Sequence, residues 1–198
     1  MTEHLTRIAV IGSGKGSNFQ AILDAIDAGE LEAEISCVLA DVEDAYILER
    51  ARQRGIPAQY ISAAPFRTKL DGDAEQAYIA FMQDHDTELI ALAGFMRMIK
   101  GGLLSAFEGR LINIHPSLLP AYPGLAAWEQ AVADGATESG CTVHYVDAGM
   151  DTGPLILQRR CPVLPDDTPG TLHARIQIEE HQAYPEALRR AISARSQA

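Results

Sequence analysis

Cysteine is scarce in this sequence, and its three occurrences are far apart. Cys37, Cys141 and Cys161 are odd in number and show no C-x-x-C spacing, which argues against a disulfide framework and against a cysteine metal site. The histidines show no ligand spacing with these cysteines either. We therefore expect reduced, mostly buried thiols and no bound metal.

Long apolar runs and an excess of positive charge are also missing. No run approaches the ~20 residues of a membrane span, and the first residues lack the basic start and apolar core of a signal peptide. The net charge of −11 opposes nucleic-acid binding, which relies on Lys and Arg facing phosphates. We expect a cytoplasmic protein with small-molecule partners. The negative charge does not exclude a phosphorylated small molecule, because main-chain N–H groups at a helix N-terminus hold phosphate without net positive charge.

The hydrophobic pattern predicts an α/β fold. The 198 residues are 47% hydrophobic, which suits one domain over residues 1–198. Apolar strands alternate with helical segments, which predicts βαβ units in a mostly parallel, twisted sheet with helices on both faces, a single-domain Rossmann-like fold. Two later strands leave little room for a helix between them and predict an antiparallel C-terminal edge. The principal strands are expected at residues 7–12, 33–40, 89–95, 111–115, 140–147 and 154–163. The last helix is expected from residue 171, with an interruption at Pro185.

A glycine-rich segment, G-S-G-K-G-S-N at residues 12–18, follows the first strand. Glycines let a main chain approach a ligand closely, and the start of a helix offers N–H groups to an anion. The spacing is not G-x-G-x-x-G, because Ser17 occupies the third glycine position, and Gly16 rules out a Walker A loop. The pattern predicts either a phosphate-binding loop or a tight turn with Ser17 or Asn18 as N-cap.

Asn113 and His115 lie two residues apart in a strand, so their side chains are expected on the same face. Pro116 ends the strand directly after them. The carboxyl end of a buried strand is where open α/β sheets bind ligands, although such a pair can also bond to nearby main chain. Asp151 lies in a loop with two glycines and a proline, where an ordinary turn aspartate is the alternative. For Glu180, on the last helix, the alternative is a solvated face.

Taken together, these segments resemble the glycinamide ribonucleotide (GAR) transformylase family of purine synthesis. The resemblance covers nearly the whole chain, and N-I-H-P-S-L-L-P followed by D-x-G-P is specific for folate-dependent formyl transfer. It implies transfer of a formyl group from 10-formyltetrahydrofolate, as co-substrate, to the amine of 5-phosphoribosylglycinamide. A related enzyme acting on another amine, such as a nucleotide sugar, is the alternative. The motifs are G-K-G-S-N at 14–18, L-A-G-F-M-R at 92–97, N-I-H-P-S-L-L-P at 113–120, Y-P-G at 122–124, G-C-T-V-H at 140–144, D-T-G-P at 151–154 and Q-I-E-E-H at 177–181.

The resemblance also implies roles for individual residues. The catalytic residues would be Asn113, His115 and Asp151: the first two would donate to the developing oxyanion, and Asp151 would favour the charged imidazole and hold a water that moves the proton. The phosphate- and nucleotide-binding half would be N-terminal and the folate-binding half C-terminal, in a monomer or homodimer. The GAR-binding residues would be Gly16, Ser17, Asn18, Pro116 and Glu180. The folate-binding residues would be Arg67, Lys69, Met96, Arg97, Met98, Ile99, Asn113, Asp147 and Asp151.

The sequence departs from the family pattern after Tyr-Pro-Gly-Leu. Relatives often have a histidine shortly after this point, whereas Leu125 is followed here by Ala126, Ala127 and Trp128. The contribution of that imidazole is therefore missing or supplied differently. A Rossmann oxidoreductase or a non-catalytic nucleotide-binding module remains a rival, but an acidic residue about 20 positions after a true G-x-G-x-x-G is not cleanly present.

Overall fold

The computed structural model describes residues 4–196. The chain divides into two compact units, Met1–Ile112 and Asn113–Ala198. The expectation of one domain over residues 1–198 stays a prediction, and residues 1–3 and 197–198 of that range lie outside the described residues.

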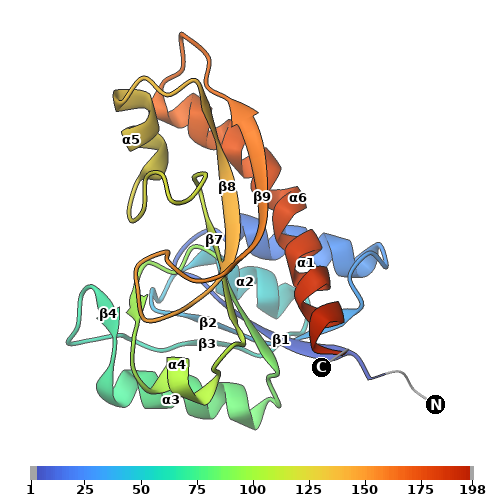
Figure 1. Cartoon of the computed structure of the whole chain (residues 1–198). Helices are drawn as coiled ribbons and strands as arrows, with labels where there is room; N and C mark the ends of the chain where they lie inside the picture. Colours follow the sequence, from blue (N-terminus) through green and yellow to red (C-terminus); the bar gives the residue numbers. More distant parts are fainter. Residues whose placement is uncertain (1–3, 197–198) are drawn as a thin grey trace. The chain divides into compact units, whose positions relative to one another are not determined.

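The first unit is a parallel sheet with helices on both faces. Its apolar strands pair as predicted, because β2 and β5 both run parallel to β1, and β3 runs parallel to β2. Residues 8–11 at the centre of β1 are fully buried, as expected for a strand covered on both faces. Helices α1 and α2 lie on one side of these strands, and α3 and α4 lie on the other (Figure 1). The strands are β1 (Thr6–Ile11), β2 (Ala33–Ala40), β3 (Ala58–Tyr60) and β5 (Leu89–Leu92), and the helices are α1 (Ser17–Asp27), α2 (Tyr46–Gln53), α3 (Gly72–Asp84) and α4 (Gly102–Ala106).

Residues 63–72 are polar and predict a loop, but the structure contains a short strand there, which is part of a second, two-stranded sheet. Strand β4 (Lys69–Leu70) pairs in parallel with β6 (Met98–Ile99). Two residues are too few to show an alternating pattern, so only the tertiary pairing reveals this strand.

Strand β7 (Leu111–His115) begins in the first unit and continues into the second. The second unit also contains β8 (Glu138–Tyr145) and β9 (Leu155–Pro162), which pair antiparallel from Glu138 opposite Pro162 to His144 opposite Leu155. The strand order of the main sheet is β3-β2-β1-β5-β7-β8-β9. The predicted α/β class, with a mostly parallel sheet and an antiparallel C-terminal edge, is confirmed.

The last helix, α6 (Pro169–Arg195), packs along β8 and β9 (Figure 1). The expected interruption at Pro185 is wrong, because the helix continues through it. An internal proline costs about 3 kcal/mol. Tyr184, Ala187 and Leu188 are fully buried around it, and burial of each large apolar side chain contributes about 1.5–3 kcal/mol. The packing therefore outweighs the break.

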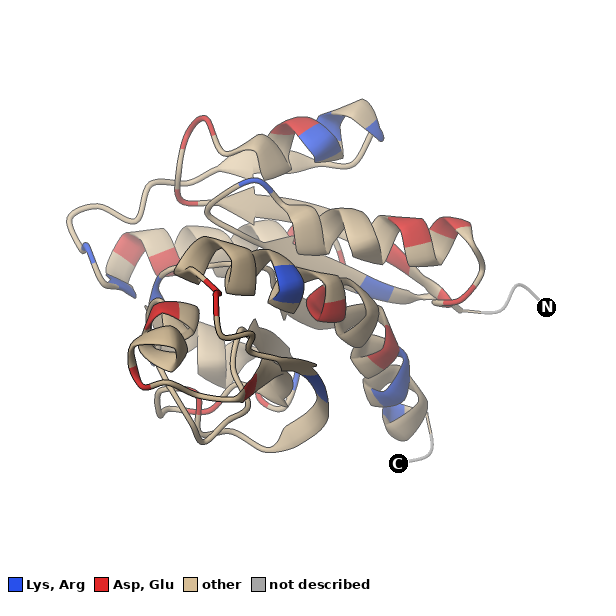
Figure 2. Ribbon diagram, turned by 90° about the horizontal axis from the view of Figure 1, so that it is seen from above, with Lys and Arg blue, Asp and Glu red and all other residues tan. Residues whose placement is uncertain are grey.

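Helix α6 begins two residues before the expected position. Thr168 is its N-cap and forms a capping box with Thr171, and proline is well suited to the first helical position. Figure 2 shows both signs of charge near the C-terminal end of this helix, where Arg190 pairs with Glu186 at 2.5 Å. No helix among residues 4–196 is long and apolar enough to cross a membrane.

Candidate active site

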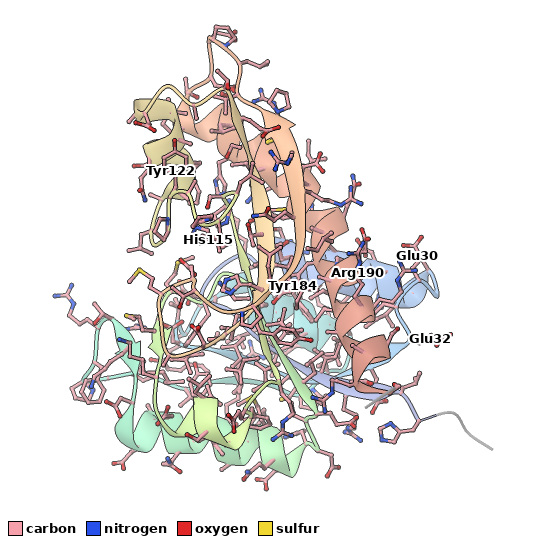
Figure 3. The ribbon with its side chains drawn as sticks, in the orientation of Figure 1. Glu30, Glu32, His115, Tyr122, Tyr184 and Arg190 are labelled. Carbon is pink, nitrogen blue, oxygen red and sulfur yellow. The ribbon has the colours of Figure 1, made fainter. Side chains whose placement is uncertain are left out.

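His115 lies at the end of β7, nearly buried, with an acceptor at each ring nitrogen. Its Nε2 is 2.8 Å from the carbonyl oxygen of Tyr122 (Figure 3). A carbonyl can only accept, so Nε2 carries a hydrogen and donates it. Its Nδ1 faces the Asp151 carboxylate, with 3.4 Å between Nδ1 and Oδ2. The structure therefore brings together two of the three residues predicted as catalytic.

Asn113, the third of them, contacts a histidine that was not among the predicted site residues. His144 of β8 is almost fully buried, and its Nε2 is 3.3 Å from the Asn113 amide nitrogen and 3.7 Å from Oδ1 of Asp151. The other ring nitrogen, Nδ1, donates to the Tyr145 carbonyl at 2.8 Å. The signal available in the sequence was the G-C-T-V-H motif at residues 140–144, of which His144 is the last residue.

Burial decides the charge of His144. Desolvation lowers the pKa of this imidazole, although the main-chain bond to Tyr145 and the charge of Asp151 act in the opposite direction. A neutral ring with a hydrogen on Nδ1 has a lone pair on Nε2. His144 therefore accepts one amide hydrogen from Asn113, which orients that amide and leaves its second hydrogen for another acceptor.

The loop between β8 and β9 contains two aspartates with different contacts: one stabilises the turn, and the other faces the histidines. Asp147 accepts from the main-chain N–H of Gly149 at 3.0 Å and from the hydroxyl of Thr152 at 2.7 Å, so it has the role of a turn residue. Asp151 instead has a left-handed backbone, with φ 54°, and its Oδ2 accepts from the N–H of Gly124 at 2.9 Å. The ordinary-turn alternative therefore describes Asp147 and not Asp151.

In the first unit, the glycine-rich segment forms the junction between β1 and α1. Of the two alternatives left open by the sequence, the tight turn with Ser17 or Asn18 as N-cap is wrong, because Gly16 is the N-cap, with φ 70° and no side-chain cap. The reason is steric, since a left-handed N-cap favours glycine. The first turn of α1 contains no acidic residue, so no carboxylate there competes with an anion for the positive end of the helix.

Arg97 is engaged within the first unit. Its Nε is 2.6 Å from Oδ2 of Asp41, and its Nη1 donates to the carbonyl oxygens of Phe66 at 2.8 Å and Arg67 at 2.5 Å. The other carboxylate oxygen of Asp41 accepts from the Ser13 hydroxyl at 2.6 Å. The guanidinium therefore joins three loops of this unit, one of them the glycine-rich segment.

Several other predicted folate-binding residues gather at the small sheet of this unit. Lys69 pairs with Met98 in the register of β4 and β6, forms an ion pair with Asp71 and lies 4.4 Å from the centre of the Phe66 ring. Met96 is 58% exposed. The small sheet therefore carries a basic side chain, and an exposed apolar side chain lies two residues before its strand β6.

Glu180, on α6 in the second unit, is not on a solvated face, because it is 5% exposed. Burial, with the charge of Glu180 as the second cause, raises the pKa of Cys141 to about 12. The same two causes raise the pKa of Tyr184, which Figure 3 labels. Glu180 is therefore a buried carboxylate.

Pro116 follows β7 in a tight turn, in which the N–H of Ser117 bonds to the His115 carbonyl at 2.9 Å. Within residues 4–196, no three or more His, Cys, Asp and Glu side chains form a group that could hold a metal ion.

Comparisons with known proteins show which family the chain belongs to. A family model described as "Formyl transferase" matches residues 6–188. Phosphoribosylglycinamide formyltransferase of Bacillus subtilis (strain 168) is 42% identical over 93% of this chain and 94% of its own length. Trifunctional purine biosynthetic protein adenosine-3 of Drosophila pseudoobscura pseudoobscura is 48% identical over 92% of this chain, which spans only 13% of that protein. The structure of glycinamide ribonucleotide transformylase 1 from Symbiobacterium toebii superposes with a TM-score of 0.89, at 46% identity, over 95% of this chain and 88% of that one. The chain belongs to the formyl transferase family.

Proposed function

We propose that this protein is a phosphoribosylglycinamide formyltransferase of purine biosynthesis. It transfers the formyl group of 10-formyltetrahydrofolate to the amine of 5-phosphoribosylglycinamide (GAR). The observation that carries the proposal is the set of contacts that joins Asn113 and Asp151 to two buried histidines, His115 and His144. Relatives that bear this name and match over most of their length support the choice of acceptor.

In the proposed reaction, 10-formyltetrahydrofolate supplies the formyl carbon. A bond forms between that carbon and the amine nitrogen of GAR, and the bond from the carbon to N10 of the folate breaks. The amine loses a proton, and the folate nitrogen gains one. The protein must therefore stabilise a transient negative charge on the formyl oxygen and move one proton.

Asn113 is suited to the first task. One amide hydrogen points to Nε2 of His144, so the second can be donated to the formyl oxygen without reorienting the amide. A donor held in place before the charge develops costs no reorganisation in the transition state. We assign His144 the role of holding Asn113 in that orientation.

His115 and Asp151 are suited to the second task. The 3.4 Å from Nδ1 to the carboxylate is longer than the usual ~2.7–2.9 Å of a charge-assisted bond. In the charged imidazole Nδ1 also carries a hydrogen, which is available to the formyl oxygen, where it shares the developing charge with Asn113, or to a water. Asp151 accepts the proton from the amine, directly or through water, and His115 supplies one to the folate side.

We also propose the remaining contacts of the two substrates. The start of α1, with Gly16, Ser17 and Asn18, holds the phosphate of GAR, which the uncapped left-handed N-cap supports. Glu180 accepts from the ribose hydroxyls, and Pro116 lies against GAR. The corner formed by residues 67–69 and 96–99, together with Asp147, binds the folate. The protein works in the cytoplasm as a monomer or homodimer, and residues 1–198 form one domain.

A turnover assay tests this proposal. Purified protein is mixed with 10-formyltetrahydrofolate and either GAR or an amine of a nucleotide sugar, and formylated product is measured. We expect turnover with GAR and none with the nucleotide-sugar amine. In Asp151→Asn the turnover rate should fall by about 10²-fold or more, the usual range for a lost acid–base group. Absence of turnover with GAR in folded protein would contradict the proposal, and turnover with the sugar nucleotide would reassign the acceptor.

A further inference from the structure

The segment Ala121–Ala126, here called the Tyr-Pro-Gly loop, touches the proposed catalytic pair through its main chain. The carbonyl oxygen of Tyr122 accepts from Nε2 of His115 at 2.8 Å, and the N–H of Gly124 donates to Oδ2 of Asp151 at 2.9 Å. These two main-chain groups belong to residues only two positions apart. A displacement of the loop would therefore move the partners of both side chains together.

The loop adopts a conformation that its residues do not favour. Tyr122 and Ala126 have φ values of 54° and 53°, in the left-handed region that L residues with a Cβ rarely occupy. Gly124 also has a positive φ, of 83°, which glycine accepts without strain. Such a main chain keeps its shape only where surrounding groups hold it.

Helix α5 (Ala127–Ala133) and the residue that ends it supply the groups that hold the loop. Gln130 donates its side-chain amide to the Leu125 carbonyl at 2.9 Å and lies 3.4 Å from the Pro123 carbonyl. The Tyr122 hydroxyl donates to Asp134 at 2.8 Å, and this bond raises the pKa of Tyr122. The loop is therefore fixed to α5 at both ends.

Helix α5 is itself anchored to α6. The rings of Trp128 and His173 stack face to face, with 3.8 Å between their centres and 6° between their planes. Offset or stacked aromatic contacts of this kind add to the stabilisation from burial alone. The loop is consequently held against a helix that itself packs on α6.

We propose that Gln130 is a positioning residue for formyl transfer. Its amide holds the Tyr-Pro-Gly loop in the left-handed conformation that keeps the Tyr122 carbonyl on His115 and the Gly124 N–H on Asp151. The inference rests on the proposed function, because it assigns the consequence of the contact to that reaction. Gln130 acts through these two residues and does not touch the reacting atoms.

The test separates a donated hydrogen bond from simple packing. Gln130→Glu keeps the shape of the side chain but places a carboxylate, which cannot donate, against two carbonyl oxygens. Gln130→Lys keeps a donor. Gln53→Glu is the matched control, because Gln53 is also an exposed helical glutamine, and its side-chain amide bonds to Glu49 on its own helix. For each variant, kcat, KM for GAR and amide hydrogen exchange at Gly124 are measured.

We expect kcat of Gln130→Glu to fall about tenfold, since small displacements of reacting groups cost up to ~10²-fold. KM for GAR should change little, and the Gly124 amide should exchange faster. Gln130→Lys should retain most of kcat, and Gln53→Glu should match the unmodified protein. If Gln130→Glu fails to fold, Gln130→Ala replaces it with the same expectation.

Two outcomes overturn the inference: a folded Gln130→Glu variant with unchanged kcat, or unchanged exchange at Gly124. If the unmodified protein does not formylate GAR, the proposed function fails instead. The exchange measurement needs no substrate, so it still decides whether Gln130 holds the loop.

Discussion

Gly16→Ala is expected to damage both the stability of the first unit and the binding of GAR. Gly16 has φ +70°, and a Cβ there would lie 2.8 Å from Cγ1, 2.9 Å from Cβ and 3.1 Å from Cα of Ile47. Ile47 is fully buried at the start of α2, so its side chain has no free space to enter. Gly29, just after the same helix α1, has nearly the same φ of +71° but no atom within 4 Å of its added Cβ. The pair therefore separates backbone strain from crowding.

The magnitudes follow from these distances. A left-handed L residue costs about 1–2 kcal/mol, and the smaller entropy of the unfolded alanine chain offsets about 0.4–1 kcal/mol. Gly29→Ala should therefore cost about 0–1.6 kcal/mol. Crowding in a packed site adds about 1–3 kcal/mol, so Gly16→Ala should cost about 1–4.6 kcal/mol. To relieve the contact, the loop must move, which displaces the N–H groups at the start of α1.

Urea unfolding followed by circular dichroism gives the stability of both variants, and calorimetry gives their affinity for GAR and for a folate analogue. We expect Gly16→Ala to bind GAR at least about tenfold more weakly, which is about 1.4 kcal/mol, with little change for folate. Gly29→Ala should bind both ligands normally. Equal stability of the two variants would refute the crowding argument, and undiminished GAR affinity in folded Gly16→Ala would remove this loop from the phosphate site.

Three further predictions concern the buried polar groups. Asn113→Ala and His115→Ala should each lower single-turnover rates by about 10²–10³-fold. The loss of rate in the double variant should be smaller than the product of the two single losses, because both side chains act on one developing charge; a loss equal to that product would show independent roles. Burial lowers the pKa of His144 from its ordinary 6.5, so the contribution of this histidine to stability is complete above that pH and is lost as pH falls, when the unfolded chain takes up the proton first. In thermal melts, His144→Gln should therefore lose less stability than the unmodified protein on acidification from about pH 7 to 5. Arg97→Met should lower the free energy of unfolding by about 3–5 kcal/mol, because it leaves the buried Asp41 carboxylate without its cation. Adding Asp41→Leu should recover part of that loss in urea unfolding, whereas additive losses of the two substitutions would exclude the coupling.

The elements that depend on local pattern were predictable. The apolar runs of β1, β2 and β5 indicate strands covered on both faces, and the short spacing before β9 indicates an antiparallel neighbour. The two-residue spacing of Asn113 and His115 places them on one face of β7, since side-chain alternation is a property of the strand itself. The family motifs add the expected chemistry to these positions.

Other features depend on partners that are distant in the sequence. The continuation of α6 through Pro185 depends on buried neighbours that outweigh the proline. Helix α5 was not predicted, because its N-cap is Ala126 in a left-handed conformation, and an alanine gives no sequence signal for that conformation. The engagement of Arg97 by Asp41, 56 residues away, is equally invisible to any local pattern.

The sequence by itself therefore determined the strand and helix types, the sheet class and the residues with suitable chemistry, because periodicity and residue type act over a few neighbouring positions. Only the tertiary structure decided which hydrogen each polar side chain donates and which group accepts it. His144 orients Asn113, Asp151 and not Asp147 faces His115, and the Tyr-Pro-Gly loop holds that pair. Hydrogen bonds are short and directional, so these assignments require the positions of atoms that the fold brings together from separate elements.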